Sequence, residues 1–252
     1  MSWLLELAGK TGNICPPGFT RTGGCPMLIR TTSEDVLTGT VVGILKNLDP
    51  GKWLGQWLNE SFQTTAFADS RFEGLDFELW ATLAPPKGLK IKEGNSHPDL
   101  IIRFDDVVIG CEAKFMAPLS SGTSHCAKRG QLLRYIDVFS NHFSAGQLFR
   151  KKVYLMTLTL EVPDQVQRYR SKDLIIKDLF ELGYSRRYAE DAANAVTVGA
   201  STWESLAGVL VRNLDAFSVN SVEEGFVLDC VAYIWTKIGQ AQAALVDRRG
   251  EQ

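Results

Sequence analysis

The segment 97–114 constrains the fold more than any other part of the chain. Its residues 99–104 and 107–114 are two largely apolar runs, joined by the dipeptide Asp105-Asp106. Two such runs around a two-residue polar link are typical of a β-hairpin, although Asp-Asp is a weaker turn signal than Asn-Gly. The segment therefore predicts two antiparallel strands.

The turn also predicts the register of this hairpin. With the turn at these two aspartates, Phe104 pairs with Val107. Continuing the same ladder places Asp99 opposite Glu112, and directly opposed side chains have Cβ atoms about 4.5–5.5 Å apart. Lys114 follows Glu112 by two positions and so points to the same side of the sheet. The register predicts one patch of two carboxylates and an amine.

This patch suggests metal-dependent phosphodiester chemistry. Asp99 and Glu112 repel each other unless a cation lies between them. Mg²⁺ fits because it prefers oxygen ligands, and the carbonyl of Ala113 can add another. A bound cation lowers the pKa of water and offsets charge on a phosphoryl group, while Lys114 can orient or deprotonate the attacking water. The alternative is a polar strand face with a salt bridge between Lys114 and Glu112.

Hydrophobic periodicity predicts the other elements. The first is a helix that begins after Thr32 or Ser33 and ends before residue 49. The same approach predicts a strand at 72–83, a helix at 127–142 and a strand at 153–160. The order α-β-β-β-α-β predicts an α/β core with a mixed central sheet. Further helices are predicted at 171–182, 185–196, 202–214 and 222–240. We therefore expect an N-terminal arm at 1–30, a core at 31–162 and a helical subdomain at 163–252.

Composition restricts the class of protein. The 252 residues carry a formal net charge of −2, which argues against a protein that coats nucleic acid through bulk charge. A local basic groove, an oligomer or a partner protein would then supply the contacts with nucleic acid. The five cysteines are scattered, as expected for reduced thiols. The start of the chain does not resemble a signal peptide, and no uninterrupted apolar stretch reaches the length of a membrane span. A cytoplasmic protein without a membrane partner is expected.

Pro98-Asp99 and Glu112-Ala113-Lys114 resemble the two motifs of the PD-(D/E)XK nuclease superfamily. The resemblance covers roughly residues 33–160. It implies the restriction-endonuclease-like fold and hydrolysis of DNA, with Mg²⁺ as cofactor and Mn²⁺ as a substitute. It also implies catalytic roles for Asp99, Glu112 and Lys114, with the first two and Ala113 as metal ligands.

Two accessory site positions also match family members. The first predicted helix of many relatives supplies an acid near the metal, a position that Glu34 can fill; alternatively, Glu34 only offsets the helix dipole. Gln131 and Tyr135 share one helix face, and their spacing resembles a motif of the RecB-type branch, which implies a catalytic role for Gln131. That branch usually has a histidine in its first helix, and this chain has none there. The alternative is an ordinary amphipathic helix.

The expected contacts with nucleic acid involve residues around the same helix. They are Lys128, Arg129, Arg134, Tyr135 and His97. Phosphate contacts by basic side chains position a duplex without reading its sequence. The alternatives are a solvated basic face and, for His97, a histidine at a strand start without a catalytic role.

These patterns together predict a Mg²⁺-dependent DNA nuclease that works as an oligomer or with a partner protein. Defence against foreign DNA is among the roles of the superfamily. One alternative is a nuclease-like subunit that mainly binds DNA or a partner. Another is a nuclease that acts on RNA or on a particular nucleic-acid structure.

Overall fold

The computed structural model describes residues 34–86, 93–122, 126–144 and 151–250. The chain divides into two compact units: unit 1 contains residues 1–53 and 203–252, and unit 2 contains residues 54–202. This division differs from the expected arm, core and helical subdomain. The expected arm and the predicted helix cap at Thr32 or Ser33 lie outside the described residues.

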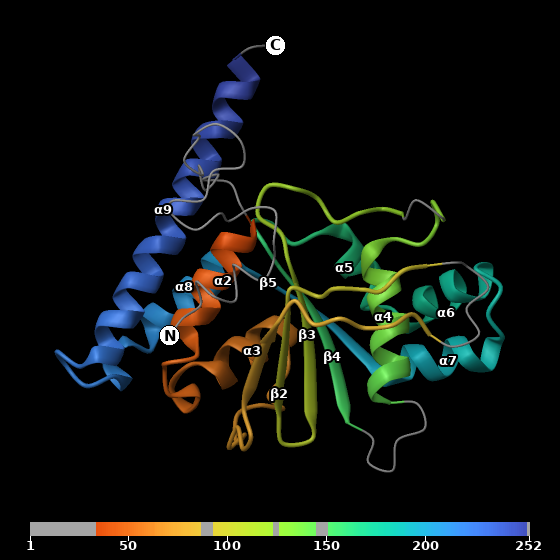
Figure 1. Cartoon of the computed structure of the whole chain (residues 1–252), viewed down its shortest axis with the longest axis horizontal. Helices are drawn as coiled ribbons and strands as arrows, with labels where there is room; N and C mark the ends of the chain where they lie inside the picture. The colour runs from red at the N-terminus through yellow and green to blue at the C-terminus, as the bar shows by residue number, and fades with distance from the viewer. Residues whose placement is uncertain (1–33, 87–92, 123–125, 145–150, 251–252) are drawn as a thin grey trace, which may run out of the picture. The chain divides into compact units, whose positions relative to one another are not determined.

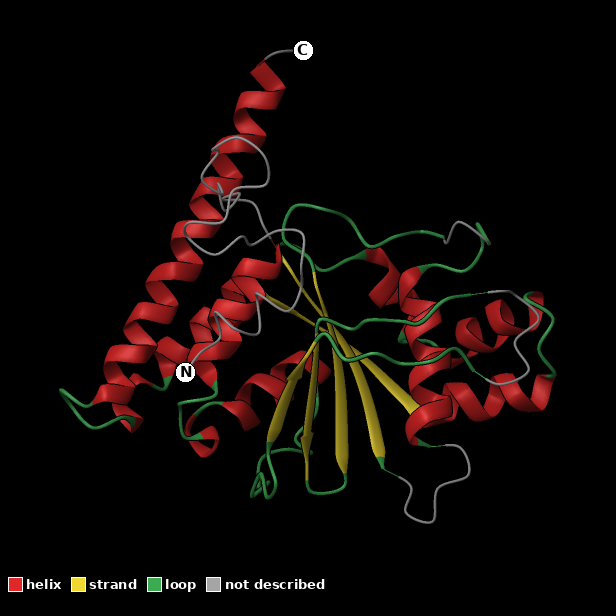
Figure 2. Ribbon diagram, viewed as in Figure 1, coloured by secondary structure: helices red, strands yellow, loops and turns green. Residues whose placement is uncertain are grey.

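Unit 2 is built on a five-stranded sheet whose strands follow in the order β1-β2-β3-β4-β5 (Figures 1 and 2). The strands are β1 (Asp76–Leu79), β2 (Leu100–Phe104), β3 (Val107–Ala113), β4 (Lys152–Thr159) and β5 (Val196–Thr202). The pairs β1–β2 and β2–β3 are antiparallel, whereas β3–β4 and β4–β5 are parallel. The expected α/β class with a mixed sheet is therefore confirmed.

Helices pack on both faces of this sheet. They are α3 (Leu54–Phe62), α4 (Gln131–Phe143), α5 (Asp164–Tyr169), α6 (Lys172–Glu181) and α7 (Arg186–Ala195). On one face, Ile136 and Phe139 of α4 pack against strand residues such as Leu155. A Cβ atom on Gly110 would lie 2.3 Å from the Phe139 ring, so glycine permits this close approach of α4 to β3. On the opposite face, α3 contacts β5.

Most predicted elements are present, but α3, α5 and β5 were not predicted. The helix predicted at 127–142 begins at Gln131, and the strand predicted at 72–83 is limited to Asp76–Leu79. Strand β5 lies in the link between two predicted helices, and it pairs with β4 along its whole length. Residues 163–202 therefore belong to the same unit as the sheet, because α5, α6, α7 and β5 contribute to its hydrophobic core.

Unit 1 is helical in its described part. It contains α2 (Glu34–Leu45), α8 (Trp203–Arg212) and α9 (Val222–Gly250), with short 3₁₀ turns at Pro50–Lys52 and Leu214–Ala216. Helices α2 and α8 both contact α9. Glu223 of α9 accepts the backbone N–H of Asp49 at 2.8 Å and pairs with Lys52 at 2.7 Å. None of the helices in the described part of the chain has both the length and the apolar composition of a membrane span.

Candidate metal centre

The β2–β3 hairpin has the predicted register. Phe104 pairs with Val107, and the ladder extends to Leu100 and Cys111. Asp99 immediately precedes β2, so the same register continues to the position opposite Glu112. The turn between the strands is tight, and Asp105 adopts a φ of 46°.

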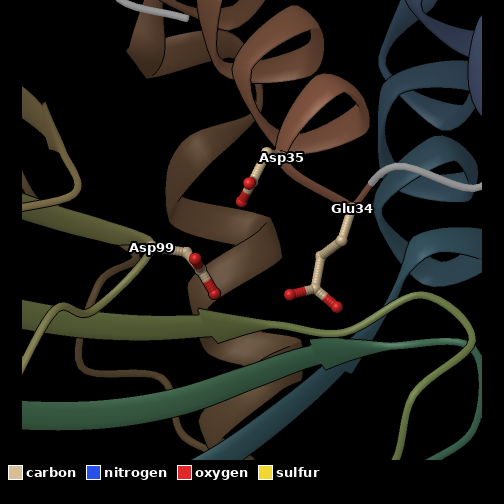
Figure 3. Close-up of side chains that lie close together, drawn as sticks. All are labelled: Glu34, Asp35 and Asp99. Atoms are coloured by element: carbon tan, nitrogen blue, oxygen red, sulfur yellow. The ribbon is translucent and has the colours of Figure 1, made fainter. Parts of the chain in front are cut away.

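Asp99 is held in place by backbone groups. Its side chain is 5% exposed, and its Oδ2 accepts a hydrogen bond from the backbone N–H of Ala113 at 2.9 Å. Its own carbonyl accepts the N–H of Trp80 at 3.1 Å. Figure 3 shows the Asp99 carboxylate projecting from the start of β2. The contact with Trp80 holds the backbone of Asp99, and the contact with Ala113 of β3 orients its carboxylate at the end of the hairpin that carries Glu112.

Glu112 is the most enclosed carboxylate of the patch. Its residue is 2% exposed, and its Oε1 lies 2.7 Å from Lys114 Nζ. The same oxygen accepts a hydrogen bond from the side-chain amide of Gln131. Two donors therefore converge on one carboxylate oxygen. The ion pair also matches the alternative of a polar strand face with a salt bridge.

Gln131 links the start of α4 to this carboxylate. Its backbone N–H donates to Ser120 O at 2.9 Å, and its Oε1 accepts the Ser120 N–H at 3.3 Å. The preceding Gly130 makes no side-chain cap for the helix. Because these backbone contacts fix both ends of the residue, the amide N–H₂ of Gln131 is directed at Glu112. The prediction of a functional Gln131 stays a prediction, but the structure brings it to the patch.

Tyr135 lies one turn further along α4. Its hydroxyl donates to the carbonyl of His97 at 3.1 Å, which ties the helix to the segment before Asp99. Burial raises the pKa of Tyr135, and the Glu112 carboxylate raises it further, so the hydroxyl stays protonated. The residue is 2% exposed, which leaves no area for the predicted contact with nucleic acid. That prediction is corrected: Tyr135 is a buried residue whose hydroxyl holds the segment before Asp99.

The predicted nucleic-acid contact at Arg129 is wrong. Arg129 precedes α4, rather than lying on it, and has 0% exposed surface. Its Nε lies 2.7 Å from Glu93 Oε1, and its Nη2 lies 2.7 Å from Asp137 Oδ2. A fully buried guanidinium between two carboxylates cannot reach a phosphate backbone.

The same buried cluster was not predicted from the sequence. Asp137 also accepts hydrogen bonds from the hydroxyls of Tyr184, at 2.6 Å, and Tyr188. The two tyrosine rings stack with centroids 4.7 Å apart. Burial opposes the charge of Arg129, but Asp137, Tyr184 and Glu93 outweigh it and raise the pKa of Arg129. The cluster joins the segment before α4 to α7 and to the segment that leads to Asp99.

Three predicted nucleic-acid contacts involve accessible residues. Lys128 and His97 are exposed, whereas Arg134 is partly buried. The Nδ1 atom of His97 lies 3.3 Å from Thr82 Oγ1. The guanidinium of Arg134 lies 5.6 Å from the centroid of the Tyr135 ring. These three contacts stay predictions.

Ala113 and Glu34 were predicted as further metal ligands. Ala113 ends β3 and is fully buried, and its backbone adjoins both acidic residues. Glu34 is the first residue of α2 and belongs to unit 1, and Figure 3 shows it in the first turn of that helix with Asp35. Both ligand roles stay predictions. No family model, curated protein or solved structure that was compared with the chain matches it.

Proposed function

We propose that the chain is a divalent-cation-dependent nuclease that hydrolyses phosphodiester bonds. The observation that carries the proposal is the pair Asp99 and Glu112, two buried carboxylates at one end of a hairpin. Their residues are 5% and 2% exposed. Lys114 lies on the same face as Glu112 and contacts its carboxylate. This arrangement follows from the confirmed register of β2 and β3.

The residues fit a hard divalent cation. Two buried carboxylates repel each other and are costly to keep charged, and Lys114 supplies one positive charge against two negative ones. The side chains of Asp99 and Glu112 and the carbonyl of Ala113 offer oxygen atoms, which Mg²⁺ and Mn²⁺ accept as ligands. When bound, the cation would act as a Lewis acid on the phosphoryl group and lower the pKa of water.

The protein groups have separate roles in this proposal. The backbone N–H of Ala113 orients Asp99, and the Gln131 amide orients Glu112. Lys114 neutralises Glu112 in the absence of a cation. With a metal ion held by Glu112, the lysine amine would be able to stabilise charge on a phosphoryl oxygen or to position the nucleophile.

The order of elements supports a restriction-endonuclease-like core. Within unit 2, α3-β1-β2-β3-α4-β4 follows the α-β-β-β-α-β order that the resemblance implies, whereas α2, the helix predicted to come first, belongs to unit 1. Asp99 immediately precedes β2, Glu112 and Ala113 end β3, and Lys114 follows that strand. We therefore propose that the sheet unit belongs to the PD-(D/E)XK class of nucleases.

DNA is the proposed substrate, with defence against foreign DNA as the proposed role. The near-neutral charge of the chain indicates that an oligomer or a partner protein supplies part of the DNA contact. Lys128, Arg134 and His97 are the proposed contacts near the patch. RNA or a structured nucleic acid is the alternative substrate, because the carboxylate chemistry acts on any phosphodiester.

A cleavage assay tests this proposal. The full chain is incubated with plasmid, linear DNA, single-stranded DNA and RNA, in Mg²⁺, in Mn²⁺ and in EDTA. We expect cation-dependent cleavage that Glu112→Gln and Lys114→Met each reduce by at least about 100-fold, the scale of losing one transition-state contact. Lys177→Met is the matched control, since Lys177 is exposed on α6. Cleavage that survives both site substitutions would refute the assignment.

The ion pair between Lys114 and Glu112 favours a second candidate, a nuclease-like subunit that binds DNA or a partner. In this pair, the ammonium group of Lys114 neutralises the Glu112 carboxylate without a metal ion. This candidate predicts no cleavage of any substrate, together with DNA binding that Glu112→Gln leaves unchanged. A gel-shift titration on the same proteins separates the two candidates.

A further inference from the structure

Thr157 lies directly beside Glu112 in the sheet. The two residues are partners in the parallel ladder between β4 and β3. Partners in neighbouring strands project to the same face, and strands lie about 4.8 Å apart. On its other side, Thr157 pairs with Ala200 of β5, whose side chain is only a methyl group. Glu112 is therefore the polar neighbour of the Thr157 hydroxyl along the sheet.

The Thr157 hydroxyl is buried without a partner. The residue has 0% exposed surface, and none of the described residues forms a hydrogen bond with its Oγ1. Thr159, two positions later on the same strand and face, donates from its Oγ1 to Glu161 O at 2.7 Å. A buried hydroxyl without a partner destabilises the fold and needs an explanation, such as a bound water, ion or ligand. The Thr157 position thus points to a ligand beside Glu112.

We propose that Thr157 is a further positioning residue of the metal site, and that its hydroxyl hydrogen-bonds to the hydration shell of the cation held by Asp99 and Glu112. Mg²⁺ dehydrates reluctantly and keeps several waters, so polar groups beyond its direct ligands matter. A hydroxyl one strand away from a carboxylate ligand is placed to contact such a water. The inference rests on the proposed function, because it assumes the same cation site.

The test compares three threonine substitutions in the full chain. Thr157→Val keeps the shape of the side chain and removes the hydroxyl, whereas Thr157→Ser keeps the hydroxyl. Thr159→Val is the matched control, because it makes the same change two residues away. Mn²⁺ binding is titrated by calorimetry or by the paramagnetic resonance signal of free Mn²⁺. We expect Thr157→Val to bind Mn²⁺ at least about tenfold more weakly, the lower end of effects for groups that support metal ligands. Thr157→Ser and Thr159→Val should bind as the unchanged protein does.

A second measurement separates this role from a structural one. Without metal, Thr157→Val should unfold at the same or a higher temperature, because it removes an unpartnered buried hydroxyl. Thr159→Val should unfold at a lower temperature, since it removes a hydrogen bond that the structure contains. Thr157→Val should therefore weaken Mn²⁺ binding without lowering stability, and Thr159→Val should lower stability without weakening Mn²⁺ binding. Unchanged Mn²⁺ affinity in Thr157→Val would overturn the inference.

Asp99→Asn distinguishes failure of this inference from failure of the proposed function. If the unchanged protein binds Mn²⁺, Asp99→Asn does not, and Thr157→Val does, the metal site stands and only the role of Thr157 is refuted. If the unchanged protein binds no Mn²⁺, both proposals are refuted.

Discussion

The carboxylate of Asp99 accepts a hydrogen bond from the backbone N–H of Ala113, at 2.9 Å between Oδ2 and N. The contact joins the residue before β2 to the last residue of β3. Asp99 is therefore both a proposed metal ligand and a closing contact of the hairpin. Substitutions at this position must separate the two roles.

Asp99→Asn is expected to abolish cation-dependent cleavage while preserving the fold. The asparagine carbonyl can still accept the Ala113 N–H, but the negative charge is lost. Asp99→Ala should abolish cleavage and also destabilise the protein by about 1–3 kcal/mol, because the buried N–H of Ala113 loses its acceptor. Urea unfolding of both variants, beside the cleavage assay, measures the two effects. Equal stability of the two variants would contradict the structural role.

The hairpin could be predicted from the sequence because the residues that determine it are close together in the chain. Apolar runs around a two-residue link determine the register, and the register determines that Asp99 follows the ladder to Glu112. The start of α4 was misplaced because Lys128 and Arg129 resemble exposed helical charges. Arg129 instead meets Glu93, 36 residues earlier, and no sequence period indicates such a contact.

The unpredicted elements have a related explanation. Strand β5 contains Val196 and Val198 but also Gly199 and Ala200, so its pattern is short and weakly apolar. Gly199 is required there because a Cβ atom would lie 2.4 Å from the ring of Phe62 on α3. The fit between α3 and Gly199 arises only in the folded protein, so the local sequence around β5 does not indicate it. The position of Thr157 beside Glu112 depends in the same way on the pairing of β4 with β3.

Arg129→Ala is expected to destabilise the protein by about 3–5 kcal/mol, because it leaves the buried carboxylate of Asp137 without its cation. The matched control is Arg186→Ala on α7, because Arg186 forms an ion pair with Glu190 and both side chains are exposed. That control should cost less than about 0.5 kcal/mol. Urea unfolding measures the loss of unfolding free energy in both variants. Similar losses would contradict the explanation that burial makes the Arg129–Asp137 pair more important than the exposed Arg186–Glu190 pair.

Gly110→Ala is expected to destabilise unit 2 by about 1–3 kcal/mol, the usual cost of overpacking a core. The new methyl group would meet the Phe139 ring, whose nearest atom lies 2.3 Å from the added Cβ. Phe139→Leu should recover part of the loss in the double variant, which a double-mutant cycle quantifies. Gly225→Ala is the control, because it lies on helix α9 with open space around it and should be slightly stabilising. Additive losses at positions 110 and 139 would refute the steric explanation.

Glu223 makes the stability of unit 1 depend on pH. Hydrogen bonds from Lys52 and from the backbone N–H of Asp49 hold the pKa of Glu223 below its usual value. The stabilisation is therefore complete above the unfolded pKa of about 4.3 and is lost as the pH falls through the lowered folded pKa. We expect the melting temperature to fall less on acidification in Glu223→Gln than in the unchanged protein. Parallel thermal melts from neutral to acidic pH measure the difference, and identical slopes would contradict it.

The division of the chain has a consequence for its biosynthesis. Residues 54–202 form unit 2 as one unbroken stretch, whereas unit 1 draws on both ends of the sequence. Domains generally fold as units while the ribosome extends the chain. All residues of unit 2 are therefore translated before α8 and α9, which complete unit 1. The strands that hold Asp99 and Glu112 thus have all their sheet partners in one continuous stretch of chain, whereas α2 must wait for the last part of the sequence to gain α9 as its packing partner.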